Sequence, residues 1–70
     1  MSRRDDEALE AVLQEMQRNR ALKYQIVQTA QSQDYENFVQ VVRSVLHRLG
    51  RTVDNFVNFV NHAYDWFRSF

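Results

Sequence analysis

Few side chains in this sequence could carry out acid–base or metal chemistry. The two histidines are His47 and His62, and helical spacing would bring His62 within reach of Asp65. Structural zinc takes four protein ligands and catalytic zinc usually three, so this pair is too small a ligand set. Cysteine is absent, which excludes thiolate ligands and disulfides. We therefore expect two solvated histidines and no bound metal or cofactor.

An acidic cluster stands near the start of the chain, at Asp5, Asp6, Glu7 and Glu10. It could bind a cation or a basic partner. Carboxylates in the first turn of a helix also interact favourably with the helix dipole, and we expect that solvated, structural role. The chain has one glycine, Gly50, so it has no glycine-rich phosphate loop. These residues predict a protein that is not an enzyme.

Two groups of basic residues offer a different function, a small regulator that contacts nucleic acid. Nine bases are balanced by nine acids, so the chain lacks the one-sided charge of a phosphate-backbone binder. A recognition helix after residue 52 would present Val53, Asp54 and Phe56 first, which suit base edges poorly. Nucleic acid is therefore the alternative rather than the leading partner. Its candidate contacts are Arg18, Arg20, Lys23, Arg43, Arg48 and Arg51.

Helices must position all these side chains. Proline is absent and glycine occurs once, and these are the strongest chain breakers. A chain of 70 residues forms one small domain, residues 1–70. Residues 53–70 sort on a helical wheel into an apolar arc of about 180° and a polar remainder. The pattern predicts a helix over 52–70, with Thr52 as its N-cap.

The preceding segment predicts a second helix over 35–49. Its N-cap would be Asp34, and Gly50 would be the left-handed residue that follows its end. Because only Gly50 and Arg51 then separate the two helices, we expect an antiparallel αα-hairpin of 35–49 and 52–70.

The first third of the chain predicts a long helix over about 5–31. An apolar stripe runs through Val12 and Met16, is interrupted by polar residues around Asn19, and resumes at Tyr24 and Val27. One long helix with a band of polar residues in its middle, which we call the polar waist, would explain this pattern. Two helices separated by a break near Asn19 would explain it as well. Because no glycine or proline stands there, we expect a continuous helix. The predicted fold is all-α, either a three-helix bundle or a helical homodimer.

The C-terminal helix presents more apolar surface than one neighbouring helix covers, which is a stripe about 100° wide. Its valine-rich side is expected to pack on 35–49. The remaining residues, which we call the aromatic edge, must be covered by the first helix or by a partner chain. Aromatic side chains are enriched at binding hot spots. The leading hypothesis is a non-enzymatic helical adaptor or regulator that binds protein and forms a homodimer through Phe59, Ala63, Trp66 and Phe70.

Membrane association is a minor interpretation. No apolar run approaches the ~18 residues that span a bilayer, and no apolar segment follows the N-terminal arginines as in a secretory signal. The polar face of 52–70 carries Asp54 and Asp65 against Arg68, whereas interfacial helices are rich in bases. Together with the absence of cysteine, these features lead us to expect a cytoplasmic protein.

Overall fold

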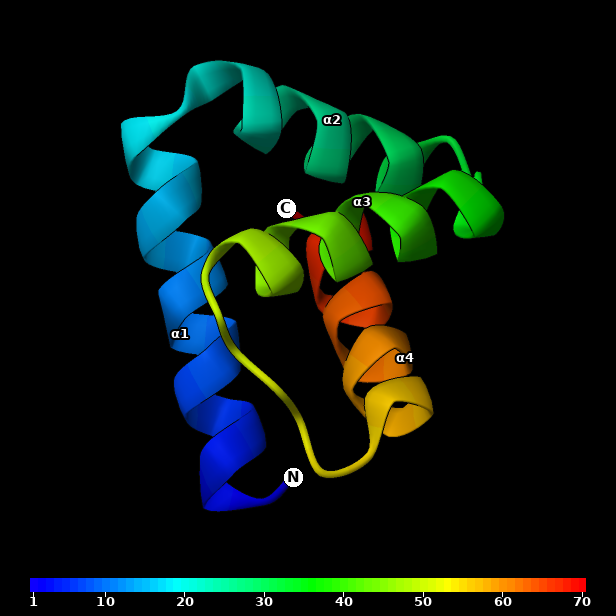
Figure 1. The fold of residues 1–70 in the computed structure, drawn as a ribbon. Coiled ribbons are helices and arrows are strands. Elements are labelled where there is room, and N and C mark those ends of the chain that lie inside the picture. Colours follow the sequence, from blue (N-terminus) through cyan, green and yellow to red (C-terminus); the bar gives the residue numbers. More distant parts are fainter.

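The computed structural model describes residues 1–70 as four α-helices with no strand. Helix α1 spans Arg3–Arg18, α2 spans Arg20–Gln31, α3 spans Tyr35–Arg48 and α4 spans Phe56–Arg68. Helix α1 stands along one side, α2 crosses from its upper end above α3, and α4 rises behind α3 to the C-terminus (Figure 1). The all-α prediction is confirmed. The three-helix bundle is wrong, because the expected first helix is two helices.

The predicted continuous helix over 5–31 breaks at Asn19. This residue has extended backbone angles, φ −128° and ψ 99°, so it cannot continue a helix. Its N–H donates to the carbonyl of Glu15, which ends α1, and its side-chain oxygen accepts from Leu22 N, which starts α2. Asparagine favours this local hydrogen bonding over a helix interior, so the chain turns here without glycine or proline.

The break also changes which residues of α2 are buried. Helix α1 buries Ala8, Val12 and Met16, and α2 begins a new stripe at Leu22, Ile26 and Ala30. Tyr24, which the continuous helix would place in the contact stripe, is 68% exposed. The polar waist is therefore the place where the chain changes direction between α1 and α2. Arg20 and Lys23 are exposed there and do not lie in the contacts between helices.

The predicted hairpin of 35–49 and 52–70 is also corrected. Helix α3 ends at Arg48 with Leu49 as its C-cap, and α4 begins only at Phe56. The N-cap is Asn55 rather than Thr52, and its side chain accepts from Asn58 N at 3.0 Å. Asparagine is the stronger N-cap of the two. The resulting loop lets α4 cross behind α3 instead of lying along it (Figure 1).

Two similar turns end α2 and α3. In each, a residue with positive φ follows the C-cap: Gln33 at 61° and Gly50 at 67°. After α2, the N–H groups of Gln33 and Asp34 donate to the carbonyl oxygens of Ala30 and Thr29. After α3, the N–H groups of Gly50 and Arg51 donate to those of His47 and Leu46. These are Schellman motifs. The left-handed conformation predicted for Gly50 is confirmed, whereas the turn at Gln33 uses a side chain that strains this geometry.

All four helices contribute to one apolar core, and α2 and α3 each pack against the three other helices. On α4, the exposed fraction of Val57 is 65%, so the predicted valine side is only partly buried. Ring contacts join α3 and α4, with Phe38 lying 5.2 Å from Tyr64 and 6.3 Å from Phe67 between ring centroids. The core consists of Ala8, Val12, Met16, Leu22, Ile26, Ala30, Phe38, Val42, Val45, Leu46, Phe59, Val60, Ala63 and Phe67.

Candidate partner-binding surface

The structure divides the predicted aromatic edge into two parts. Phe59 and Ala63 are each 1% exposed and belong to the apolar core. Trp66 and Phe70 lie at the C-terminal end of α4 and are 43% and 53% exposed. Only Trp66 and Phe70 therefore lie where a partner could reach them without unfolding the chain.

The two exposed rings are held in place by a buried one. Phe67 is fully buried, and its ring centroid lies 5.3 Å from that of Trp66 and 5.3 Å from that of Phe70. Trp66 and Phe70 also contact each other edge to face, at 5.7 Å. Such aromatic pairs are stabilising beyond the area that they bury. The exposed rings therefore pack against a buried ring and against each other.

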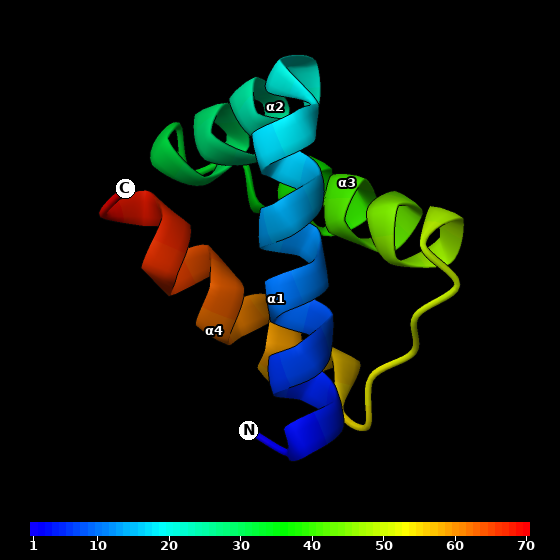
Figure 2. The ribbon, with the colours of Figure 1, turned by 90° about the vertical axis from the view of Figure 1, so that its left-hand side faces the viewer.

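Phe70 continues this surface onto α2. The side-chain amide of Gln31 donates to the carbonyl oxygen of Phe70 at 3.3 Å, which holds the end of the chain beside the last turn of α2. Figure 2 shows the C-terminus beside that end of α2. An open groove runs from Phe70 along the outer side of α2. We call it the α2–Phe70 groove, and its lining residues are Arg20, Lys23, Tyr24, Val27, Gln28, Gln31 and Phe70.

The charged side chains that line the α2–Phe70 groove are all positive. Its lining includes two cations, Arg20 and Lys23, and no acidic residue. Neither cation forms an ion pair, whereas the ion pairs of this chain involve Arg3, Arg4, Arg18 and Arg68. Exposed aromatic rings and free cations therefore lie along the same groove.

The other predicted nucleic-acid contacts do not join this groove. Arg18 forms an ion pair with Glu15 at 3.4 Å. Arg48, on α3, lines a different groove, which lies between α2 and α3. Arg43 stacks over the ring of Phe56, 4.8 Å from its centroid, and lines a third groove together with Arg51. The six bases thus occupy separate surfaces, and the structure brings together only Arg20 with Lys23 and Arg43 with Arg51.

The histidines and Asp65 lie apart from the α2–Phe70 groove. His62 and His47 are exposed, and His47 lines the groove of Arg43 and Arg51. Asp65 pairs with Arg68 at 3.8 Å. Nowhere do three or more histidine or acidic side chains come close enough to hold a metal ion.

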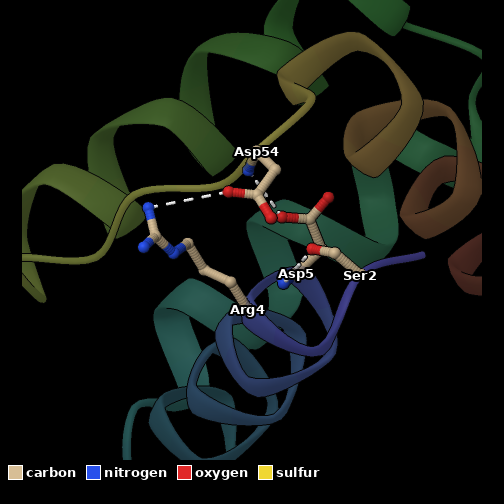
Figure 3. A network of polar contacts seen from close by, with 4 residues as sticks. All are labelled: Ser2, Arg4, Asp5 and Asp54. Atoms are coloured by element: carbon tan, nitrogen blue, oxygen red, sulfur yellow. Dashed lines mark hydrogen bonds and ion pairs between the residues drawn. The ribbon is translucent and has the colours of Figure 1, made fainter.

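The acidic cluster contains a buried residue that the sequence did not reveal. Asp5 is 2% exposed, and its carboxylate accepts a hydrogen bond from the backbone N–H of Asp54 at 2.7 Å (Figure 3). Ser2 caps the same turn by accepting from Asp5 N at 3.2 Å, and Arg4 reaches the Asp54 side chain at 3.6 Å. The expected solvated role is therefore wrong for Asp5, which fastens the start of α1 to the loop before α4. The other acids of the cluster, Asp6, Glu7 and Glu10, are exposed.

Spacing alone could not identify this contact. Asp5 and Asp54 are 49 residues apart, and Asp5 and Asp6 are both acidic residues of the first turn of α1. One weak indication was available, because Asp5 lies three residues before Ala8, at the helical spacing that continues the buried stripe of α1.

None of the four helices is long and apolar enough to cross a membrane. In comparisons with known proteins, no family model, curated protein or solved structure matches the chain. The α2–Phe70 groove and the aromatic rings beside it are therefore the features of this chain that bear on function.

Proposed function

We propose that this chain is a non-enzymatic helical adaptor or regulator that binds another protein through the surface formed by Trp66, Phe70 and Tyr24. The observation that carries the proposal is the exposure of three large rings beside a groove, two of them held against buried Phe67. Trp and Tyr are the residues most often found at binding hot spots. Rings that already pack against their neighbours lose less side-chain entropy on binding, which favours such a surface as a binding site.

Affinity capture from the native host tests this proposal when three forms of the chain are compared. We expect the wild type and Val57→Ala to retain the same partner, and Trp66→Ala/Phe70→Ala to lose it. Val57 is the matched control, because it is an exposed apolar residue of α4 outside the groove. Circular dichroism must show equal helicity in all three forms. If the double variant retains the partner, or loses its helicity together with the partner, this surface is not the binding site.

Self-association remains a second part of the proposal. The apolar width of α4 motivates it, although Phe59, Val60, Ala63 and Phe67 of that face are buried in the core of the chain itself. Sedimentation equilibrium at tens of micromolar chain tests it directly, in the concentration range that corresponds to a moderate dimer affinity. A single species of monomer mass would remove the homodimer and leave the protein-binding proposal standing.

Nucleic acid is the alternative partner, and one observation favours it. Arg20 and Lys23 lie near exposed Tyr24, and single strands bind to surfaces that combine cations with aromatic rings. The zero net charge and the separation of the other four bases favour protein instead. A gel-shift assay with single-stranded DNA at about 50 mM salt decides, because backbone contacts are strong at low salt. Absence of a shift would retire this alternative.

A further inference from the structure

We infer that the α2–Phe70 groove binds an acidic amphipathic segment of the partner protein, with an apolar anchor against Phe70 and acidic side chains against Arg20 and Lys23. The inference rests on the proposed function and specifies the chemistry of its partner. It follows from three features of the groove: its charge, its length and its apolar area.

Charge complementarity determines the acidic part of the partner. Arg20 and Lys23 are exposed, have no acidic neighbour along the groove and take part in no ion pair. A partner carboxylate placed there would form contacts that the free chain lacks. A basic partner segment would be repelled, and this repulsion provides selectivity.

The length of the groove sets the spacing of the partner's two features. Phe70 is hydrogen-bonded to Gln31 at one end of α2, and Arg20 is the first residue of α2 at the other end. Gln31 lies eleven positions after Arg20, which at a helical rise of 1.5 Å per residue corresponds to about 16 Å. An apolar anchor and an acidic residue placed two to three turns apart on one helix face would match these two ends.

The apolar area favours a short segment over a second copy of this chain. Aromatic side chains bury about 200 Å² each, and Tyr24, Trp66 and Phe70 are about half exposed, so their free area is on the order of 300 Å². A standard stable interface buries about 800 Å² on each partner, of which somewhat over half is apolar, so these rings alone fall short of it. The occupant that fits is therefore a peptide-sized acidic segment.

Selection from a displayed library of helical peptides with randomised surface positions tests the inference without assuming a sequence. The wild-type chain is the bait, and the most enriched peptide is then measured by fluorescence anisotropy. We expect enriched peptides to carry an excess of Asp and Glu two to three turns from an apolar residue. Arg20→Gln/Lys23→Gln should weaken binding roughly two- to thirty-fold, as expected for two exposed ion pairs. Added salt should reduce this difference.

A matched control separates local from general charge effects. Arg48→Gln/Arg51→Gln removes the same charge from exposed residues outside the α2–Phe70 groove, and it should leave the affinity unchanged. Peptides that require Trp66 and Phe70 but carry no acidic excess would overturn the inference and leave the proposed function intact. Enriched peptides that bind Trp66→Ala/Phe70→Ala as well as the wild type would overturn both.

Two further outcomes would assign the groove to another occupant. A single-stranded oligonucleotide that binds the wild type but not Arg20→Gln/Lys23→Gln, with no peptide recovered, would make it a nucleic-acid site. A dimer in sedimentation equilibrium that is lost in Trp66→Ala/Phe70→Ala and that no peptide displaces would make a second copy the occupant. Either result would overturn the inference.

Discussion

Removing the carboxylate of Asp5 should destabilise the fold far more than removing that of its neighbour Asp6. Both are acidic residues in the first turn of α1, so the substitutions Asp5→Ala and Asp6→Ala lose similar dipole interactions and gain similar helix propensity. They differ in that Asp5 is 2% exposed and accepts from Asp54 N at 2.7 Å, whereas Asp6 is exposed. A hydrogen bond to a charged group contributes about 1.5–3 kcal/mol.

The difference in unfolding free energy between the two alanine variants should therefore be about 1.5–3 kcal/mol. Urea denaturation followed by circular dichroism measures it. In a chain of this size the corresponding difference in melting temperature is at least about 6 °C. Asp5→Asn should fall between Asp5→Ala and the wild type, because the amide oxygen can still accept the hydrogen bond without the charge.

Asp54→Ala provides a second control for the same contact. Asp5 binds the backbone N–H of Asp54, so this substitution keeps that hydrogen bond and removes only the ion pair with Arg4. Both side chains of that pair are more than half exposed, and such pairs contribute under about 1 kcal/mol. If Asp5→Ala and Asp6→Ala unfold within about 0.5 kcal/mol of each other, the contact at Asp5 does not stabilise the fold as argued.

The remaining predictions concern the turns and the stripe of α2, and the same denaturation assay measures them all. Gly50→Ala should cost about 1 kcal/mol and Gln33→Gly should stabilise by a similar amount, because both positions have positive φ; effects of equal sign would contradict this reasoning. Asn19→Ala should cost about 0.5–2 kcal/mol through loss of the cap on α2, and an unchanged stability would contradict the break. Ile26→Ala should cost about 2–5 kcal/mol and Tyr24→Ala under about 1 kcal/mol, whereas a continuous first helix predicts the reverse order.

The sequence predicted the helical class and much of the second half of the chain because periodicity reports directly on burial. The expected helix over 35–49 corresponds to α3, and the left-handed Gly50 follows its end. The errors lie where a polar side chain, rather than the apolar pattern, determines the backbone. Asn19 breaks the first helix, Asn55 delays the start of α4, and Asp5 holds the loop between α3 and α4. In each case the decisive hydrogen bond joins a side chain to a backbone N–H, which a helical wheel does not represent.

The candidate site illustrates a further limit of the wheel, which gives direction around a helix axis but not position along it. At about 100° per residue, Phe59 and Phe70 point only about 20° apart, so the wheel assigns them one environment. Yet Phe59 is 1% exposed and Phe70 is 53% exposed. Phe59 lies deep among the helices, whereas Phe70 follows the end of α4 and is tied to the last turn of α2 at Gln31.

The same two helix ends explain why cations share the groove with aromatic rings. Because the chain turns at Asn19, α2 starts a new buried stripe, and its opposite face presents Arg20 and Lys23 instead of burying them. Helix α4 then ends beside the far end of that face and adds Phe70 to it. Without the break, these bases would lie in a helix contact, where unpaired cations are costly. The turn at Asn19 therefore both relieves the core of two charges and places them in the groove that we propose as the binding site.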